Sequence, residues 1–296
     1  MSMLDGRVVI VTGGGRGLGR AHCLELAAQG ATVIVNDLPG GDESDPAKEV
    51  VAEIEAIGGT AVADPTSVSD FDGVAAMVER AVSEFGRLDG VVNNAGILRD
   101  KMLTSMAEAD FDAVIAVHLK GSFNLTHHAS LHWRALGKAG KPVSGRIVNT
   151  TSGAGLWGNV GQLNYATAKA GLVAMTTVTA MEMGRYGVTA NVVSPIARTR
   201  MTADLSLGWE EQSEGFDRLD PANTSPAVAW LVSEASGWLT GALLRVDGDT
   251  IMRVNGFQMD DVVRYRTAAG AKLDAAKLDA GMRRAYGLVP GGIPAG

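Results

Sequence analysis

Short runs of valine and isoleucine alternate with longer helical patterns along most of the chain. Seven runs have the length of a β-strand, at residues 8–12, 32–36, 60–63, 88–93, 146–151, 189–193 and 243–246. Their residues are apolar at successive positions, so both faces of each strand must be covered, as in a parallel sheet between two layers of helices. The alternation therefore predicts an α/β fold with a doubly wound, seven-stranded, mostly parallel sheet and helices on both faces.

Helical periodicity fills the intervals between these runs. It predicts helices at residues 18–29, 46–57, 71–85, 107–136 and 161–185. In a sheet of this kind the crossovers are right-handed, and ligands bind beyond the carboxyl ends of the strands. We therefore expect the functional residues in the turns that follow the strands.

Composition and charge exclude several classes of protein. With 46% hydrophobic and 20% charged residues the chain is ordinary globular material, and its net charge of −7 provides no basic surface for nucleic acid or anionic membranes. The single cysteine, Cys23, cannot form an internal disulfide, and no apolar run has the length of a membrane span. We expect a cytoplasmic protein with a small-molecule substrate, and neither nucleic acid nor a membrane as partner.

The pattern changes near the carboxyl end. After Gly256 the chain is rich in Ala, Asp, Lys and Arg, with "AKLDA" repeated from Ala271 to Ala280, and it ends in "VPGGIPAG". We expect one main domain over residues 1–256 and an extension over residues 257–296. The extension is predicted to be partly helical, with a flexible end.

A glycine-rich turn, "TGGGRGLG", joins the first predicted strand to the first predicted helix. Gly13, Gly17 and Gly19 let backbone N–H groups approach a pyrophosphate, and the helix N-terminus favours negative charge there. The second strand ends at Asp37, which is placed to accept hydrogen bonds from an adenosine ribose. Asp37 would repel the 2′-phosphate of NADP, whereas Arg16 would attract it. We give Asp37 the greater weight and predict a Rossmann-type site for NAD rather than NADP.

Tyr165 and Lys169 stand one helical turn apart in "NYATAK". Residues at i and i+4 share a helix face, so both side chains can approach a common third group. A tyrosine with its ordinary pKa near 10 is a poor base at neutral pH unless positive charge stabilises the phenolate. The pair is therefore a candidate for acid–base chemistry.

Taken together, these motifs resemble the short-chain dehydrogenase/reductase family over about residues 5–250. The resemblance rests on "TGGGRGLG", "NNAG" at residues 93–96, Ser152 thirteen residues before Tyr165, "YATAK" and "TGALLRVDG". It implies hydride transfer between a carbinol carbon and a nicotinamide, with no metal. Tyr165 would move the hydroxyl proton, Ser152 would hydrogen-bond the substrate oxygen, and Lys169 would bind the nicotinamide ribose and stabilise the phenolate.

The resemblance also implies a set of cofactor contacts. They are Gly13, Arg16, Gly17, Leu18, Gly19, Asp37, Asp64, Asn93, Ala95, Gly96, Tyr165, Lys169, Pro195 and Thr199. Asn93 is expected mainly to brace the central strand, and Asp64 to contact adenine, although Pro65 after it is unusual. Thr199 would border the nicotinamide carboxamide or cap a helix.

His118 departs from the family pattern, which has an asparagine that holds a water in a proton relay. A neutral imidazole can hold a water and pass a proton, so His118 is a candidate relay residue; the alternative is a packed helix histidine. With "VNDL", "GQLNYATAK" and "SPIARTRMT", His118 resembles the (3R)-hydroxyacyl-CoA dehydrogenase unit of peroxisomal multifunctional enzymes and its bacterial relatives.

The sequence thus predicts an NAD-dependent oxidoreductase that interconverts a secondary alcohol and a ketone, first of all a 3-hydroxyacyl-CoA. Arg198, Arg200 and Arg218 are candidates for binding the CoA nucleotide, or are solvated charges. A hydroxysteroid or another bulky hydrophobic alcohol is the alternative substrate. A nucleotide-binding regulator without catalysis is a further alternative. The family commonly forms dimers or tetramers through the long helices around His118 and Tyr165, so the resemblance implies a homodimer or homotetramer.

Overall fold

The computed structural model describes residues 2–40, 45–198, 215–255 and 278. The chain divides into two compact units, Met1–Val254 and Asn255–Gly296. All described residues except Asn255 and Leu278 belong to the first unit. The boundary after residue 256 and the nature of the extension stay predictions.

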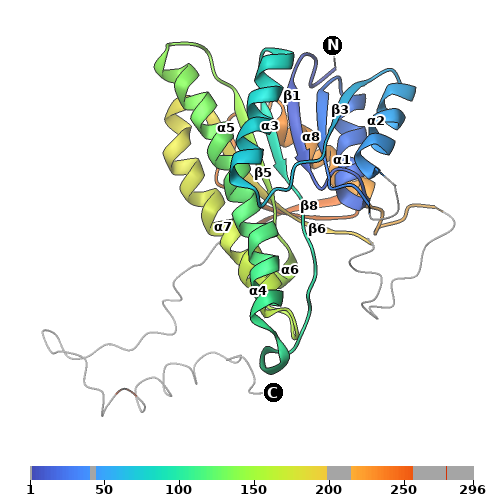
Figure 1. Ribbon diagram of the computed structural model, residues 1–296, viewed down its shortest axis with the longest axis vertical. Helices are drawn as coiled ribbons and strands as arrows, with labels where there is room; N and C mark the ends of the chain where they lie inside the picture. Colours follow the sequence, from blue (N-terminus) through green and yellow to red (C-terminus); the bar gives the residue numbers. More distant parts are fainter. Residues whose placement is uncertain (1, 41–44, 199–214, 256–277, 279–296) are drawn as a thin grey trace, which may run out of the picture. The chain divides into compact units, whose positions relative to one another are not determined.

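One sheet of eight strands forms the centre of the first unit, in the order β3-β2-β1-β4-β5-β6-β7-β8 (Figure 1). The strands are β1 Val8–Thr12, β2 Thr32–Asn36, β3 Thr60–Asp64, β4 Gly90–Asn93, β5 Gly145–Thr150, β6 Val188–Ile196, β7 Leu243–Asp247 and β8 Thr250–Val254. Neighbours pair in parallel except β7 and β8, which are antiparallel. The strand order reverses between β1 and β4, so the loops after these strands diverge and leave a crevice for a ligand.

The prediction of seven strands was wrong by one, because it missed β8. Asp247 pairs with Thr250 across a two-residue turn, and Gly248 in this turn has a φ of 57°, which suits glycine. Four of the five residues of β8 are exposed. An edge strand of this kind lacks the continuous apolar run by which the other strands were recognised.

Helices cover both faces of the sheet (Figure 1). They are α1 Gly17–Ala28, α2 Pro46–Ala56, α3 Phe71–Phe85, α4 Glu108–Ile115, α5 Gly121–Lys138, α6 Gly153–Trp157, α7 Leu163–Met183 and α8 Ser225–Val232. Val9 and Val11 of β1 pack in a core with α1, α2 and α8. Val8 and Ile10 pack in a second core with α3, α5 and α7. Successive residues of one strand thus enter opposite cores, which confirms the predicted doubly wound α/β fold.

The helix predicted at residues 107–136 contains an irregularity. A π-helical turn over Ala116–Lys120 joins α4 to α5. A π turn accommodates one extra residue and often occurs at a functional site. Here the turn carries His118, whose side chain is buried. Periodicity alone does not predict such an insertion, and it also missed the short helices α6 and α8.

None of the helices in the described part of the chain is both long and apolar enough to cross a lipid bilayer.

Candidate active site

A cleft of about 360 Å³ opens where the strands end, between the loops that follow β1, β2, β3, β4 and β5 and the end of β6. Most of the predicted site residues line it. They are Gly13, Arg16, Gly17, Leu18, Gly19, Asp37, Ala95, Gly96, His118, Ser152, Tyr165, Lys169 and Pro195. Residues from distant parts of the sequence thus meet at the place where a sheet of this topology binds its ligand.

The glycine-rich turn has the shape of a phosphate cradle. Gly13 has a φ of 63°, and a Cβ there would lie 2.8 Å from the Cα of Ala95. A Cβ on Gly19 would overlap the carbonyl oxygen of Gly13. The helix α1 begins without a side-chain cap and without an acidic residue in its first turn. Its first N–H groups therefore have no carboxylate or hydroxyl from the cap position, which fits a bound pyrophosphate.

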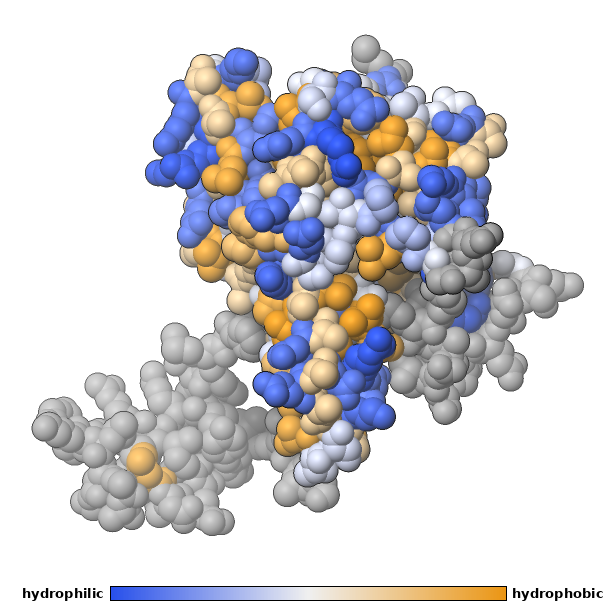
Figure 2. Space-filling model, in the orientation of Figure 1, coloured by the Kyte–Doolittle hydropathy of each residue, from blue (hydrophilic) through white to orange (hydrophobic). Residues whose placement is uncertain are grey.

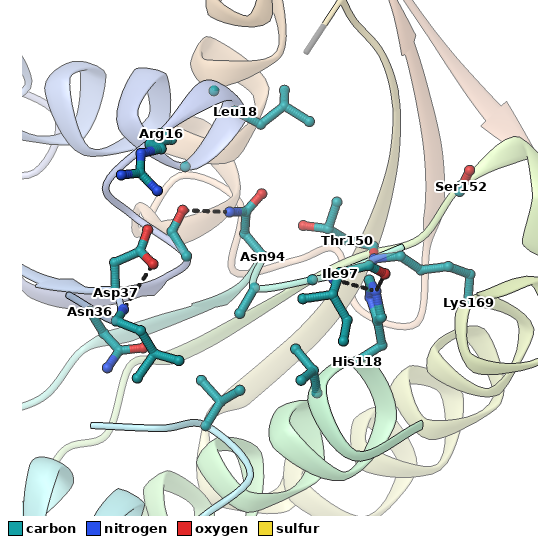
Figure 3. A pocket seen from close by; sticks show the side chains of 18 of the residues that line it. Arg16, Leu18, Asn36, Asp37, Asn94, Ile97, His118, Thr150, Ser152 and Lys169 are labelled. Atoms are coloured by element: carbon teal, nitrogen blue, oxygen red, sulfur yellow. Dashed lines mark hydrogen bonds between the residues drawn. The ribbon is translucent and has the colours of Figure 1, made fainter. Parts of the chain in front are cut away.

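Asp37 stands at the end of β2 and lines the cleft. Its Oδ2 accepts a hydrogen bond from the Gly15 N–H at 2.9 Å, and its Oδ1 accepts one from the Leu38 N–H at 2.9 Å. These two bonds hold the carboxylate in place. Figure 3 shows Arg16 and Asp37 on the same side of the cleft, so the two opposite charges that were weighed for cofactor choice lie in one region of it.

Two of the predicted cofactor residues that the structure describes, Asp64 and Asn93, are not among the lining residues. The carboxylate of Asp64 is buried, forms an ion pair with Arg80 and accepts a hydrogen bond from Thr66 N–H at 2.9 Å. Asn93 donates to Asn149 Oδ1 at 2.8 Å, which ties β4 to β5 as expected of a brace. Thr199 lies outside the described residues.

The segment that follows Asp64 does reach the cleft. Thr66, Ser67 and Val68, which follow β3, line the cleft themselves. Asn36 donates to the carbonyl oxygen of Thr66 at 2.8 Å and so holds this segment against the end of β2. Asp64 itself does not line the cleft. Its carboxylate binds the N–H of Thr66 and so helps to hold in place a segment that does line the cleft.

Lys169 is almost fully buried in α7. Its Nζ donates a hydrogen bond to the carbonyl oxygen of Thr150 at 2.6 Å and lies 5.6 Å from the centroid of the Tyr165 ring. Burial lowers the pKa of Lys169 to about 7. The amine therefore exists in both its neutral and its charged form near neutral pH.

The pKa of the Tyr165 phenol is raised above its usual value, first by burial. A hydrogen bond with the Ser152 side chain acts in the opposite direction, and the charge of Asp100 adds to the rise. The sequence led us to expect that nearby positive charge would stabilise the phenolate and lower this pKa. In the protein without cofactor, the effect of burial is larger, and the pKa is raised. Ser152 also caps α6, since its Oγ accepts a hydrogen bond from Ala154 N–H at 3.3 Å.

His118 packs against Tyr165, with the two ring centroids 5.2 Å apart and the planes at 87°. Its Nε2 lies 2.9 Å from Ile97 N and 2.8 Å from Ile97 O, and the tautomer decides which bond forms. Its Nδ1 is buried and has no hydrogen-bond partner among the described residues. Burial, and secondarily the charge of Lys169, lowers the pKa of His118 to about 3, although the backbone of Ile97 opposes this. The imidazole is therefore neutral at physiological pH.

The sequence interpretation missed Asn94 as a site residue. Its Nδ2 donates to the carbonyl oxygens of Thr12 at 3.0 Å and Gly13 at 3.1 Å, which ties the loop after β4 to the glycine-rich turn. The Thr12 hydroxyl oxygen accepts from the N–H groups of Asn94 and Ala95, each at 3.1 Å. The second asparagine of "NNAG" was the available signal, because a polar residue just after a buried strand lies at the ligand-binding edge.

Two of the three arginines considered for the CoA nucleotide have carboxylate partners. Arg198 forms an ion pair with Asp217 at 3.1 Å, and Arg218 forms one with Asp247. Arg200 lies outside the described residues. Since their charge is already balanced locally, Arg198 and Arg218 offer less attraction to a phosphate than the sequence suggested.

Comparison with known proteins places this geometry in a family. Residues 7–208 match the family described as short chain dehydrogenase. The chain is 44% identical over 284 residues to hydroxyacyl-CoA dehydrogenase ChsB1 of Mycobacterium tuberculosis, covering 95% of this chain and 88% of that protein. It is 42% identical over 265 residues to peroxisomal multifunctional enzyme type 2 of Drosophila melanogaster, covering 81% of this chain and 42% of that longer protein.

A solved structure supports the same assignment. The crystal structure of a short chain dehydrogenase from Mycobacterium avium matches with a TM-score of 0.88 and 48% sequence identity, covering 99% of this chain and 98% of that chain. The shape of the glycine-rich turn, the residues around Tyr165 and these matches all support the same family. The chain belongs to the short-chain dehydrogenase/reductase family and is an oxidoreductase that uses NAD(P) and acts on CH–OH groups.

Proposed function

We propose that this protein interconverts a 3-hydroxyacyl-CoA and the corresponding 3-oxoacyl-CoA with NAD as cofactor. One observation carries the proposal: Ser152, Tyr165, Lys169 and His118 line a single cleft together with the glycine-rich turn. The relative named hydroxyacyl-CoA dehydrogenase, which aligns over 95% of this chain, supports the substrate class. A sensor without catalysis would not need such a set of proton-transfer groups.

When bound, the nicotinamide ring supplies or accepts the hydride at the carbinol carbon. In the reductive direction, the Tyr165 phenol donates its proton to the carbonyl oxygen while Ser152 hydrogen-bonds the same oxygen. The raised pKa of Tyr165 keeps the phenol protonated, which suits this step. Lys169, whose pKa of about 7 permits both protonation states, restores the proton to Tyr165.

His118 serves in this proposal as the relay residue that replaces the family's asparagine. Its ring touches Tyr165, and its charge state does not change near neutral pH because its pKa is about 3. The unpartnered Nδ1 can hold a water that leads from Lys169 towards solvent. If His118 is only a packed helix residue, its side chain is buried in the same way. The two interpretations differ in whether Nδ1 binds a water that passes a proton.

The cofactor preference rests on Asp37. Two backbone N–H groups fix its carboxylate at the end of β2, beside the expected adenosine ribose. A 2′-phosphate placed there would face a negative charge that cannot turn away, which favours NAD over NADP.

The test follows NADH or NADPH absorbance while the purified protein meets acetoacetyl-CoA. We expect turnover with NADH, and a kcat/KM at least about 10-fold lower with NADPH, equivalent to about 1.4 kcal/mol. Asp37→Asn keeps an acceptor for Gly15 N–H but removes the charge, so the difference in kcat/KM between NADH and NADPH should become smaller. The control variant Asp72→Asn, on the exposed side of α3, should leave this difference unchanged. No turnover with either cofactor, despite intact NADH binding, would refute the acyl-CoA proposal.

One observation favours the alternative of a bulky hydrophobic alcohol. Met102 and Leu103, in the loop between β4 and α4, are 58% and 67% exposed, and Leu163 at the start of α7 is 44% exposed. Figure 2 shows hydrophobic residues between hydrophilic ones on the lobe that contains α4. If acetoacetyl-CoA is not reduced, steroid ketones are the next substrates to assay.

We also propose that the protein is a cytoplasmic homodimer or homotetramer. Large apolar side chains stand exposed on α5 and α7, namely Phe123 (46%), Leu131 (46%), Val178 (52%) and Met181 (79%). We expect a mass in solution that is two or four times 30.7 kDa. The double variant Val178→Glu and Met181→Glu should lower it, because buried unpaired charge is costly. A wild-type protein of monomeric mass in light scattering would contradict the proposal.

A further inference from the structure

The cleft has two ends, which lie on opposite sides of the glycine-rich turn. This turn follows β1, whereas Asp37 follows β2 and Ser152 follows β5, so the strand order places these two residues on opposite sides of the turn. Figure 3 shows Asn36 and Asp37 at one end of the cleft, and Ser152 and Lys169 at the other. A dinucleotide with its pyrophosphate in the turn and its nicotinamide near Tyr165 must therefore place its adenine beyond Asp37, on the side of β3.

Three residues that follow β3 line the cleft at this end. They are Thr66, Ser67 and Val68, and we call this segment the β3 wall. At its first residue, Asn36 Nδ2 donates to the carbonyl oxygen of Thr66 at 2.8 Å. At its last residue, Asn124 Nδ2 donates to the carbonyl oxygen of Val68 at 2.8 Å. Side-chain amides from two different elements, β2 and α5, thus fix the backbone of the β3 wall.

Asn124 holds the wall from the first turn of α5. It is fully buried and is not among the residues that line the cleft. Its Oδ1 is buried and has no hydrogen-bond partner in the described part of the chain. A buried amide oxygen without a partner lowers stability, so a leucine of similar size would suit packing alone. The hydrogen bond from Nδ2 to Val68 is therefore the contact that favours asparagine at this position.

Gly121, three residues earlier, lets α5 approach the same residue of the wall. A Cβ on Gly121 would lie 2.7 Å from Cγ2 of Val68 and 3.0 Å from its Cβ. The π-helical turn runs directly into α5, so Gly121 lies inside a continuous helical stretch, where alanine is normally the more stable residue. Two separate features of α5, a donated hydrogen bond and a missing side chain, thus fit the helix against Val68.

We propose that Asn124 and Gly121 are positioning residues for the adenine half of the cofactor, because together they fix the β3 wall at the end of the cleft where the adenine binds. Neither residue lines the cleft, so both act through Val68. Tyr165 and Lys169 belong to α7, so the nicotinamide half should be affected much less. The proposal depends on the NAD(P) cofactor of the family and not on the acyl-CoA substrate proposed above.

Binding of two cofactors tests the proposal without any substrate. NADH contains the adenine half, whereas reduced nicotinamide mononucleotide lacks it. We expect Asn124→Leu to raise the Kd for NADH about 10-fold, because the wall loses one hydrogen bond from the helix. The Kd for reduced nicotinamide mononucleotide should stay within about twofold of wild type, since the change is remote from the nicotinamide end. Fluorescence titration measures both constants, and thermal unfolding establishes that the variant is folded.

Gly121→Ala tests the same wall without removing a hydrogen bond. The added Cβ should displace Val68 and raise the Kd for NADH, again by about 10-fold. Combining it with Val68→Ala removes Cγ2, which is the closest atom to the added Cβ. The double variant should therefore recover most of the lost NADH affinity. If it does not, the effect does not pass through the wall, and the inference is wrong.

Asn191→Leu is the matched control. Asn191 is a buried asparagine of β6 whose Nδ2 donates to the carbonyl oxygen of Leu239 at 3.0 Å, and it does not line the cleft. Its replacement removes a comparable hydrogen bond elsewhere in the fold. The ratio of the two dissociation constants should therefore equal that of the wild type, even if the variant unfolds at a lower temperature.

The outcomes separate the inference from the proposed function. An unchanged Kd for NADH in a folded Asn124→Leu variant would overturn the inference, and so would an equal loss of affinity for both cofactors. A selective loss of NADH affinity in a protein that does not reduce acetoacetyl-CoA would support the inference and refute the proposed substrate.

Discussion

Replacing Tyr165 with phenylalanine should lower kcat by about 10³-fold, within the range of 10² to 10⁴ that a positioned acid or base contributes. The substitution removes one hydroxyl from a side chain that is packed against His118 and keeps the ring in place. NADH binding should be weakened far less than kcat, since the variant leaves the glycine-rich turn and the other predicted cofactor contacts unchanged and removes only the contact of the Tyr165 hydroxyl. The measurement is steady-state reduction of acetoacetyl-CoA beside a fluorescence titration with NADH.

The matched control for this change is Tyr186→Phe. Tyr186 lies after α7, its ring stacks with Arg185, and it is absent from the residues that line the cleft. It should keep wild-type activity. If Tyr165→Phe retains more than about one tenth of wild-type kcat, the phenol is not the group that moves the proton.

Replacing Gly19 with alanine should weaken NADH binding by about 100-fold or more, equivalent to about 2.7 kcal/mol. A Cβ at this position overlaps the carbonyl oxygen of Gly13 and lies 2.6 Å from Asn94 Nδ2. The Gly13 carbonyl is backbone and cannot rotate away, so the turn must open and its N–H groups leave their positions around the pyrophosphate. Calorimetric titration with NADH measures the loss.

The control for Gly19→Ala is Gly184→Ala. No heavy atom outside the immediate chain lies within 4 Å of a Cβ at Gly184, so this variant should bind NADH as the wild type does. Thermal unfolding of both variants establishes that they are folded. Wild-type NADH affinity in a folded Gly19→Ala variant would show that the turn does not cradle the cofactor.

Burial acts on Tyr165 and Lys169 in opposite directions. It raises the pKa of the phenol and lowers that of the amine, so each group is driven towards its neutral form. A neutral phenol is a ready proton donor, and an amine with a pKa of about 7 both releases and accepts a proton near neutral pH. Desolvation thus brings both groups to pKa values that suit proton transfer. The charge of Asp100 also raises the pKa of the phenol.

Local patterns predicted the central strands well. The intervals predicted at residues 8–12 and 32–36 agree with β1 and β2, and the helix at residues 71–85 agrees with α3. Each has a strong periodic or continuous apolar pattern, because each is buried against two layers or carries a distinct apolar face. The exposed strand β8 and the five-residue helix α6 carry no such pattern and were missed.

The sequence by itself determined the fold class, the glycine-rich turn between the first strand and the first helix, and the neighbouring positions of Tyr165 and Lys169. These features depend on residue types at short spacing, which local geometry converts into structure. Only the tertiary structure decided that Asp64 pairs with Arg80, that a π-helical turn buries His118 against Tyr165, and that Gln162 holds Asp100. Such contacts join residues far apart in the chain, and burial, which sets the pKa values of Tyr165, Lys169 and His118, exists only once the chain has packed.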